Sequence, residues 1–417
     1  MNLDFYDETT YTLNMEKVFY QEETKMKKRI LSVLLSTVLI MSLLVGCNAK
    51  PAAETGGAEA TEENSEEGIK AIAIEDLKIG FVHITDPSDM GYTYNHDLGT
   101  KEMQEALGLK DDQIINKFNV SEDASCDTAI RELVEAGCNV IFATSFGFED
   151  YMLQIAGEYP DIQFCHATGY KAAGSGLKNM HNYFASIYEA RYLAGIAAGL
   201  KTESNKLGYV AAFPYAEVIS GYSAFYLGAK SVNPDVTMDI MYTNSWHDPT
   251  VEAQVAKALI ERGCDVLGQH SDSTAPATTA EENAVWQVGY NNDMIEAAPK
   301  ASLISARIDW GIYLIEAVKA IIEGNEIPVD WCKGLSDSAV YLSALNSDIA
   351  ADGTEEAIAK AAEAIKAGDL KVFSGELKGV SPEGEEIHVA AGEHFSEQEE
   401  ASAPSWSYVL EGCTVVE

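Results

Sequence analysis

The chain has 417 residues, with 66 Asp and Glu against 28 Lys and Arg, and a formal net charge of -38. A composition of 47% hydrophobic and 23% charged residues is typical of a globular protein and excludes wholesale disorder. At roughly 150 residues per domain the length allows two or three domains. Beyond a short basic segment near Met26 the sequence has no cluster of Lys and Arg, which argues against nucleic acid as a partner.

The N-terminal residues contain a targeting signal that must be set aside before the fold is interpreted. Residues 1–25 show no sustained periodicity, whereas Met26 opens a basic cluster followed by an apolar run that ends at Val45. That run is shorter than the roughly 20 residues of a transmembrane helix. We interpret residues 1–25 as an upstream extension, which favours Met26 over Met1 as the true start, and residues 26–46 as a lipoprotein signal peptide.

The signal peptide ends in the sequence L-V-G-C, whose last residue is Cys47. This ending resembles the bacterial lipobox, in which a Cys after a small residue is acylated and becomes the first mature residue. The alternative is a plain signal anchor with an incidental Cys. Residues 47–76 are rich in Glu and lack aromatic residues, so we expect an acidic, flexible tether. A lipid on Cys47 would hold the folded part outside the cell membrane.

Six further cysteines follow the predicted anchor. Their spacing is irregular and several lie in apolar, strand-like runs, which favours buried free thiols over disulfides. The sequence contains no C-x-x-C pair and no His/Cys cluster, so we expect neither a metal site nor a cofactor. The six are Cys126, Cys138, Cys165, Cys264, Cys332 and Cys413.

From Leu77 onward, short apolar runs alternate with amphipathic stretches, a pattern that predicts an α/β fold with parallel sheets. The first set of predicted strands covers Ile79–Ile84, Ile114–Val120, Val140–Thr144, Gln163–Ala167 and Tyr183–Ile187. Its predicted helices cover Tyr94–Leu107, Ser125–Glu135, Glu149–Gly157 and Glu189–Leu200. The second set of predicted strands covers Leu207–Phe213, Thr237–Tyr242, Val266–Gln269 and Trp286–Tyr290. Its predicted helices cover Val218–Ser231, Val251–Arg262 and Ala275–Asn283.

This repetition predicts two doubly wound, Rossmann-like lobes with a ligand cleft between them. We assign residues 77–200 and about 293–325 to lobe 1, and residues 201–292 and about 326–417 to lobe 2. Ligands of such sheets bind beyond the carboxyl ends of the strands. The residues at those ends are Thr85 to Tyr92, Ser145 to Phe148, Trp246 to Asp248, His270 to Ser273 and Asn291 to Asp293.

Aromatic and short polar side chains recur at these strand ends, and Lys and Arg are absent from them. Such a site suits a flat, neutral, hydrogen-bonding ligand better than a phosphate or carboxylate. The sequence has no nucleotide-binding, zinc-protease or nucleophile-elbow motif. A pair such as Asp89 and Asp293 could do acid–base work only if buried together, which spacing cannot show. We therefore expect a binding protein rather than an enzyme.

The strand-end segments resemble the basic membrane protein family of ABC-transporter substrate-binding lipoproteins, which have the type I periplasmic-binding-protein fold. The matching text, between about residues 78 and 380, is IGFVHITDPSDMGYTYNHDLG, VIFATSFGFED, GYVAAFPYAEVISGYSAFYLGAK, TNSWHDPTVEAQVAKALIERGCDVLGQHSDSTAP, GYNNDM and AIKAGDLKVFSGELKG. The resemblance implies uptake of a purine nucleoside or nucleobase, which is passed to a membrane permease driven by an ATPase. We expect the protein to be a monomer.

The resemblance also implies which residues contact the ligand. These are Asp89, Tyr92, Ser145, Phe146, Trp246, Asp272, Asn291 and Asp293. The sequence departs from the family at two points. Tyr92 stands where relatives commonly have Trp, and the sequence R-I-D-W from Arg307 stands where relatives often have W-D-W or a Lys. The choice between base and nucleoside therefore stays open.

Several of these residues have a structural alternative. Tyr92 could be an aromatic at the cleft rim, Trp246 could cap the core beneath its loop, and Phe146 could be an ordinary core residue. Asp272 could be a helix N-cap. Asp293 has the strongest functional case, because a carboxylate after a buried strand needs a donor, and a purine N–H or a ribose hydroxyl is one.

Two other functions fit the same sequence. A lipid-anchored sensor or co-receptor would have the same fold and would present its ligand to a membrane receptor instead of a permease. An exported nucleoside-processing enzyme is the third hypothesis.

Overall fold

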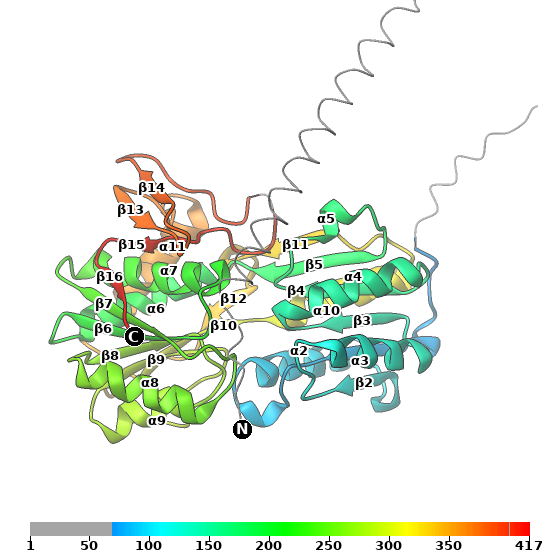
Figure 1. Ribbon diagram of the computed structural model, residues 1–417, viewed down its shortest axis with the longest axis horizontal. Helices are drawn as coiled ribbons and strands as arrows, with labels where there is room; N and C mark the ends of the chain where they lie inside the picture. Colours follow the sequence, from blue (N-terminus) through cyan, green and yellow to red (C-terminus); the bar gives the residue numbers. More distant parts are fainter. Residues whose placement is uncertain (1–68, 400) are drawn as a thin grey trace, which may run out of the picture. The chain divides into compact units, whose positions relative to one another are not determined.

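The computed structural model describes residues 69–399 and 401–417 (Figure 1). The predicted signal peptide, the predicted lipid anchor Cys47 and most of the predicted tether lie outside the described residues. The end of that tether is folded, contrary to the expected boundary. The 3-10 helix η1 spans Ile74–Asp76, and Gln113 Nε2 donates to the Ile74 carbonyl over 2.6 Å. Ile72, which packs against the core, donates its N–H to the Ile321 carbonyl.

Lobe 1 is a six-stranded, entirely parallel sheet in the order β2-β1-β3-β4-β5-β11. Its strands are β1 (Ile79–Val82), β2 (Ile114–Lys117), β3 (Val140–Ala143), β4 (Gln163–Ala167), β5 (Met180–Ala185) and β11 (Asp330–Lys333). Its helices are α2 (Tyr92–Leu107), α3 (Ala124–Glu135), α4 (Glu149–Glu158), α5 (Ala172–Ser175) and α10 (Trp310–Glu323). Short 3-10 turns are η2 (Pro87–Asp89), η3 (Asp111–Gln113) and η4 (Phe146–Phe148).

Lobe 2 is a seven-stranded sheet in the order β12-β10-β9-β8-β6-β7-β16, parallel except for β12. Its strands are β6 (Lys206–Ala211), β7 (Thr237–Tyr242), β8 (Val266–Gln269), β9 (Trp286–Tyr290), β10 (Ser302–Ile308), β12 (Val340–Leu342) and β16 (Cys413–Val415). Its helices are α6 (Ile187–Lys201), α7 (Ala216–Val232), α8 (Pro249–Glu261), α9 (Ala275–Glu282) and α11 (Thr354–Ala367), and η5 (Leu335–Asp337) precedes β12. The predicted fold of two doubly wound lobes is confirmed.

Both sheets are covered by helices on both faces, and this explains the composition of their strands. In β1, Ile79 and Phe81 face the core shared with α2 and α10, whereas Val82 faces the core shared with α3 and α4. A strand buried on both faces needs apolar residues at nearly every position rather than at alternate ones. Helix starts are marked by capping carboxylates, for example Asp123, which accepts from the Ser125 N–H over 2.8 Å.

The chain crosses between the lobes three times, and the crossings correct the predicted lobe boundaries. Helix α6, expected in lobe 1, packs against α7 and β10 of lobe 2. Strand β10, also expected in lobe 1, pairs with β9. Strand β11, expected in lobe 2, pairs with β5. An apolar run in the sequence shows that a segment is buried, but not which of two similar sheets it joins.

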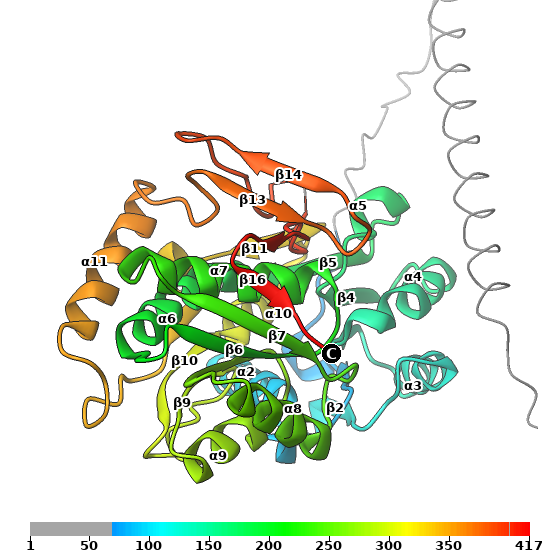
Figure 2. The same cartoon turned by 60° about the vertical axis from the view of Figure 1, so that its left-hand side comes forward.

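After α11 the chain adds a small antiparallel sheet beside α7 (Figure 2). Its strands are β13 (Leu377–Val380), β14 (Glu386–Val389) and β15 (Val409–Leu410). Trp406 is fully buried beneath this addition, and its ring stacks on Phe373 at 4.6 Å.

The six cysteines of the described residues are all free, as predicted, and Cys126, Cys138, Cys165 and Cys264 are buried. Nowhere in residues 69–399 or 401–417 do three or more His, Cys, Asp and Glu side chains group so that they could hold a metal ion. The helices of this part of the chain are too short or too polar to cross a membrane.

Candidate functional site

A cavity, which we call the inner cavity, lies where the carboxyl ends of the two sheets face each other. Most residues of its wall lie in the loops that follow the strands, which is where doubly wound sheets bind ligands, whereas Tyr92 begins α2 and Glu217 lies in α7. The lining residues are Ile84, Tyr92, Thr144, Ser145, Phe146, Thr168, Glu217, Trp246, His270, Asp272 and Tyr290.

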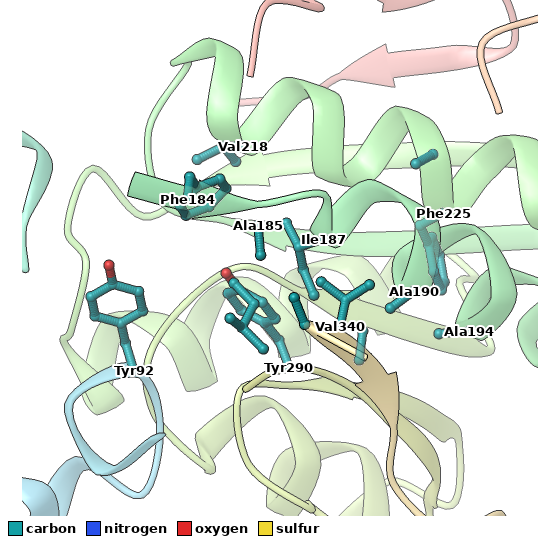
Figure 3. Close-up of a cluster of buried hydrophobic side chains, with 14 of the residues drawn as sticks. Tyr92, Phe184, Ala185, Ile187, Ala190, Ala194, Val218, Phe225, Tyr290 and Val340 are labelled. Carbon is teal, nitrogen blue, oxygen red and sulfur yellow. The ribbon is translucent and has the colours of Figure 1, made fainter. Parts of the chain in front are cut away.

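The structure brings together five of the eight residues that the sequence proposed for the site: Tyr92, Ser145, Phe146, Trp246 and Asp272. Tyr92 is held by its hydroxyl, which donates to the Thr144 carbonyl over 2.7 Å. Tyr290 approaches from the other lobe, and Figure 3 shows its hydroxyl pointing to the same side as that of Tyr92. The cavity therefore has aromatic side chains from both lobes in its wall.

The lobes touch each other across the cleft through Glu122, which the sequence analysis did not single out. Its Oε1 accepts from Ser145 Oγ and from the Gly147 N–H, both over 2.7 Å and within lobe 1. Its Oε2 accepts from Trp246 Nε1 of lobe 2 over 3.3 Å. One carboxylate thus connects predicted site residues of both lobes.

A second pair of cross-cleft contacts involves an aromatic stack and a glycine. The ring of Phe146 in lobe 1 stacks on Tyr215 of lobe 2 at 5.1 Å. A Cβ atom added to Gly91 of lobe 1 would lie 2.1 Å from the Asp272 carbonyl oxygen of lobe 2. Only glycine allows the two backbones to approach this closely.

Asp89 and Asp293, expected to contact the ligand, do not line the inner cavity. Asp89 is buried and caps the start of α2, where it accepts from the N–H groups of Gly91, Thr93 and Tyr94. Asp293 is half-buried, and its Oδ1 accepts from the N–H of Ile295 two residues further on.

Asn291 lies next to the cavity residue Tyr290 but outside the cavity wall. It is fully buried, and neither atom of its amide group has a hydrogen-bond partner among the described residues. Its carbonyl accepts from Arg307 Nε over 2.9 Å. Arg307 also reaches Asn95 of lobe 1, whose Oδ1 accepts over 3.3 Å. Arg307, one of the residues at which the sequence departs from its family, therefore contacts the backbone of the predicted site residue Asn291 and also a residue of the opposite lobe.

The most important group that sequence reasoning missed is a buried chain of Arg191, His270 and Glu217. Arg191, 3% exposed, donates to Gln269 O and to His270 Nδ1, each over 2.9 Å. A guanidinium can only donate, so Nδ1 is the acceptor and the imidazole proton is on Nε2. Nε2 lies 3.5 Å from Glu217 Oε1 at the cavity wall. Burial, and then the charge of Arg191, hold the pKa of His270 well below its usual value, so the ring is neutral.

The carboxyl groups of the cavity wall are also shifted toward their neutral forms. Burial raises the pKa of Glu217 to about 8. Burial, followed by the charges of Asp89 and Glu252, raises the pKa of Asp272 well above its usual value. A neutral carboxyl group both donates and accepts, so these walls offer hydrogen bonds without net charge. The wall itself contains no Lys or Arg side chain to pair with a phosphate.

Glu217 gives the folded protein a testable pH dependence. Because its folded pKa is about 8 against an ordinary 4.5, its stabilising contribution is complete below pH 4.5 and is lost as the pH rises to about 8. Glu217→Gln keeps the neutral shape and does not titrate. We expect variant and wild type to match near pH 4.5, and the variant to become more stable by up to a few kcal/mol at pH 8. Urea unfolding without ligand at both pH values gives the free energy of unfolding of each protein. If the difference between variant and wild type is the same at pH 4.5 and pH 8, the prediction is wrong.

Two polar atoms in the wall have no partner among the described residues, the Thr168 Oγ1 and the Tyr290 hydroxyl. Buried polar atoms are usually paired, because leaving one unpaired costs about 1–3 kcal/mol. Thr168 also has a φ of 66°, which is rare for a β-branched residue. Strain and unpaired polar atoms at one place indicate a site arranged for a ligand.

The chain is similar to known substrate-binding proteins over most of its folded part. The Bmp family, described as ABC transporter substrate-binding protein PnrA-like, matches residues 77–371. The purine-binding protein BAB2_0673 of Brucella abortus is 38% identical over 75% of this chain and 87% of its own length. The putative ABC transporter glucose-binding protein TsgA13 of Haloferax volcanii is 33% identical over 72% of this chain and 75% of its own.

The fold is also that of solved solute-binding proteins. The crystal structure of an ABC transporter solute-binding protein from Aeropyrum pernix matches with a TM-score of 0.62 at 16% identity, covering 71% of this chain and 93% of that one. Members of the matching family bind solutes outside the cytoplasm and are not enzymes. With its match over most of the folded chain, this protein belongs to the Bmp family of PnrA-like ABC transporter substrate-binding proteins.

Proposed function

We propose that this protein binds a purine base or nucleoside in the inner cavity and delivers it to an ABC permease. The observation that carries the proposal is the cavity wall, which combines aromatic rings with neutral hydrogen-bonding groups and has no basic side chain. A purine has two apolar faces and a rim of donors and acceptors, so it matches such a wall. The similarity to a purine-binding protein supports the same ligand class.

In this proposal the site residues have two kinds of role. Tyr92, Phe146 and Trp246 provide the apolar surfaces, and Ser145 and Asp272 contribute polar contacts at the rim. Three further residues act from behind the wall. Asn291 offers an unpaired amide, Asp89 fixes the start of α2 from which Tyr92 projects, and Asp293 fixes the turn after β9.

A ligand panel tests the proposal. The purified protein is heated with purine bases, nucleosides, amino acids and sugars, with glucose included because a relative is described as a glucose-binding protein. A ligand at about 100 times its dissociation constant stabilises the fold by about 2.7 kcal/mol, which raises the melting temperature measurably. We expect a purine to produce the largest rise. A rise with glucose and none with any purine would refute the ligand assignment.

Two further measurements separate transport from the other functions. Overnight incubation with inosine, adenosine and guanosine should return each ligand unchanged after denaturation, whereas cleaved products would indicate an enzyme. Deletion of the gene should reduce uptake of labelled purine by whole cells. Normal uptake together with tight binding would favour the sensor or co-receptor function.

We also propose that a lipid on Cys47 anchors the protein to the outer side of the cell membrane. Cys47→Ser removes the thiol that would be acylated, so the variant should accumulate as an unprocessed precursor that incorporates no labelled fatty acid. Immunoblotting and metabolic labelling measure both effects. Wild-type labelling of the variant would contradict the assignment, and Cys126→Ser, which changes a buried thiol, is the matched control.

A further inference from the structure

The loop that follows β4 begins with Thr168, a wall residue of the inner cavity whose hydroxyl has no partner among the described residues. Thr168 is 3% exposed and has a φ of 66°, a backbone conformation that a β-branched residue rarely adopts. Such a conformation persists only where the surrounding structure fixes it. The contacts that hold this loop therefore decide where the Thr168 hydroxyl points.

The hydrogen bonds that hold the loop come mostly from one buried carboxylate. Glu149, the first residue of α4, is 3% exposed, and its Oε1 accepts from the N–H groups of Tyr170 and Lys171, each over 2.8 Å. The same oxygen accepts from Asn182 Nδ2 of β5 over 3.0 Å. Asn182 Oδ1 in turn accepts from the Ala172 N–H over 2.8 Å. Side chains of α4 and β5 therefore supply the acceptors for three consecutive N–H groups of the loop.

Gly169, the neighbour of Thr168 in the chain, lies where these side chains meet. A Cβ atom added to Gly169 would lie 2.3 Å from each of three side-chain atoms, which are Glu149 Oε1, Asn182 Nδ2 and His166 Nδ1. Side chains from α4, β5 and β4 thus pack directly against the backbone next to Thr168. Only glycine allows them to approach the backbone so closely.

His166 connects the same group of side chains to a second wall residue. Its Nε2 lies 2.8 Å from the Ser145 carbonyl, which can only accept, so the ring donates there and its Nδ1 is left as an acceptor beside Gly169. Ser145 lines the inner cavity from the loop after β3, and Glu149 follows that loop in the chain. A cluster of Glu149, His166 and Asn182 therefore supports two neighbouring loops of the cavity wall from behind.

We propose that Glu149 is a positioning residue, which does not line the inner cavity but fixes the loop after β4 so that the Thr168 hydroxyl meets the ligand. This inference rests on the proposed function, because it places the ligand in the inner cavity. A loop that is fixed before the ligand arrives loses less conformational freedom on binding, which favours affinity. Without the carboxylate, the N–H groups of Tyr170 and Lys171 lose their acceptor, and the loop that carries Thr168 is free to move.

A double-mutant cycle tests whether Glu149 acts through Thr168. The ligand is whichever of hypoxanthine, adenine, inosine and adenosine raises the melting temperature most, titrated by calorimetry. Thr168→Val removes the hydroxyl and keeps the β-branched shape, and Glu149→Ala removes the acceptor, so each should weaken binding about 10-fold. If both act through one contact, the double variant should also lose about 10-fold rather than about 100-fold. Glu149→Gln keeps an acceptor oxygen for the loop and should bind within about 3-fold of wild type.

Hydrogen exchange of the unliganded protein gives a second measurement. In Glu149→Ala the amides of Tyr170 and Lys171 should exchange at least about 10-fold faster than in wild type, whereas Thr168→Val should leave their exchange unchanged. Asp150→Ala is the matched control. Asp150 follows Glu149 in α4, and its 74% exposed side chain pairs with Lys171 Nζ rather than with the backbone of the loop. Because an exposed ion pair contributes little, this variant should change neither exchange nor affinity.

The outcomes separate the two proposals. If the losses from Thr168→Val and Glu149→Ala multiply, or if Glu149→Ala binds normally, the inference is wrong while the proposed function stands. If the wild type binds no purine, the proposed function fails and the inference fails with it. If melting curves show that Glu149→Ala is unfolded, Gly169→Ala replaces it in the cycle, because its Cβ displaces the cluster without removing a polar group. Its loss of affinity should likewise not multiply with that of Thr168→Val.

Discussion

Replacement of Gly91 by alanine is expected to weaken ligand binding about 5- to 150-fold while the unliganded protein stays folded. The added Cβ would lie 2.1 Å from the Asp272 carbonyl oxygen, and the Asp272 Cα is only 2.9 Å away. Both are backbone atoms, so no side-chain rotation relieves the clash. Overpacking of this kind costs about 1–3 kcal/mol. Because Gly91 belongs to lobe 1 and Asp272 to lobe 2, the cost falls on the arrangement in which the lobes touch.

The test compares affinity with stability. Calorimetric titration gives the affinity, the melting temperature without ligand gives the stability, and X-ray scattering gives the separation of the lobes. Gly157→Ala is the matched control, because a Cβ there meets nothing within 4 Å. A normal affinity in the Gly91 variant would show that the lobes do not need this approach to hold the ligand.

The sequence predicts where several strands begin and end, because the chain changes from apolar to polar residues where it leaves the sheet. Strands β4, β7, β8 and β9 begin and end at the predicted residues. Each is a short apolar run in a sheet covered on both faces, so its composition changes sharply where the chain leaves the sheet. Lobe membership is not a local property. Strand β11 has the short sequence D-W-C-K, which gives no apolar run to predict a strand, and only its pairing with β5 places it in lobe 1.

For the candidate site, too, the sequence predicts what depends on local position and not what depends on the contacts of the folded chain. The rule that ligands lie beyond strand ends leads to three residues of the inner cavity wall, Tyr92, Phe146 and Trp246, because each lies in or just after a loop that follows a strand. The rule cannot separate a carboxylate that faces a ligand from one that caps its own turn. Asp89 and Asp293 both follow strands, yet both accept from backbone N–H groups nearby.

A rule based on strand ends cannot identify site residues that lie within helices. Arg191 in α6 and Glu217 in α7 lie in helices whose apolar periodicity gives no reason to single out one charged residue. Their importance depends on burial and on contacts across the sheet, such as that between Arg191 and His270. One signal was present in the sequence. A long Arg side chain within an otherwise apolar helix must be paired when it is buried, and the pairing group marks a polar site.

Replacement of Trp246 by alanine should weaken purine binding about 5- to 150-fold, since stacking of a base on an aromatic side chain is worth about 1–3 kcal/mol. Trp246 lines the inner cavity and packs edge-on against Phe213 at 5.0 Å. The substitution also removes the hydrogen bond from Nε1 to Glu122, which joins the lobes. Both losses act against the liganded form, so affinity should fall more than the stability of the unliganded protein.

Trp246→Phe separates these two contributions. Phe keeps an aromatic face but cannot donate to Glu122. The loss of affinity in the Phe variant therefore measures the hydrogen bond between Trp246 and Glu122, and the further loss in the alanine variant measures stacking. Glu122→Gln is the complementary change, because its amide has one acceptor oxygen where the carboxylate has two, so it cannot accept from Trp246 Nε1 in lobe 2 and from Ser145 and Gly147 in lobe 1 at the same time. Calorimetric titrations of the three variants, with melting curves of the unliganded proteins, give each part. A collapse of the unliganded Trp246→Ala protein would mean that this tryptophan caps the core beneath its loop, since a residue that serves the ligand leaves the empty protein folded.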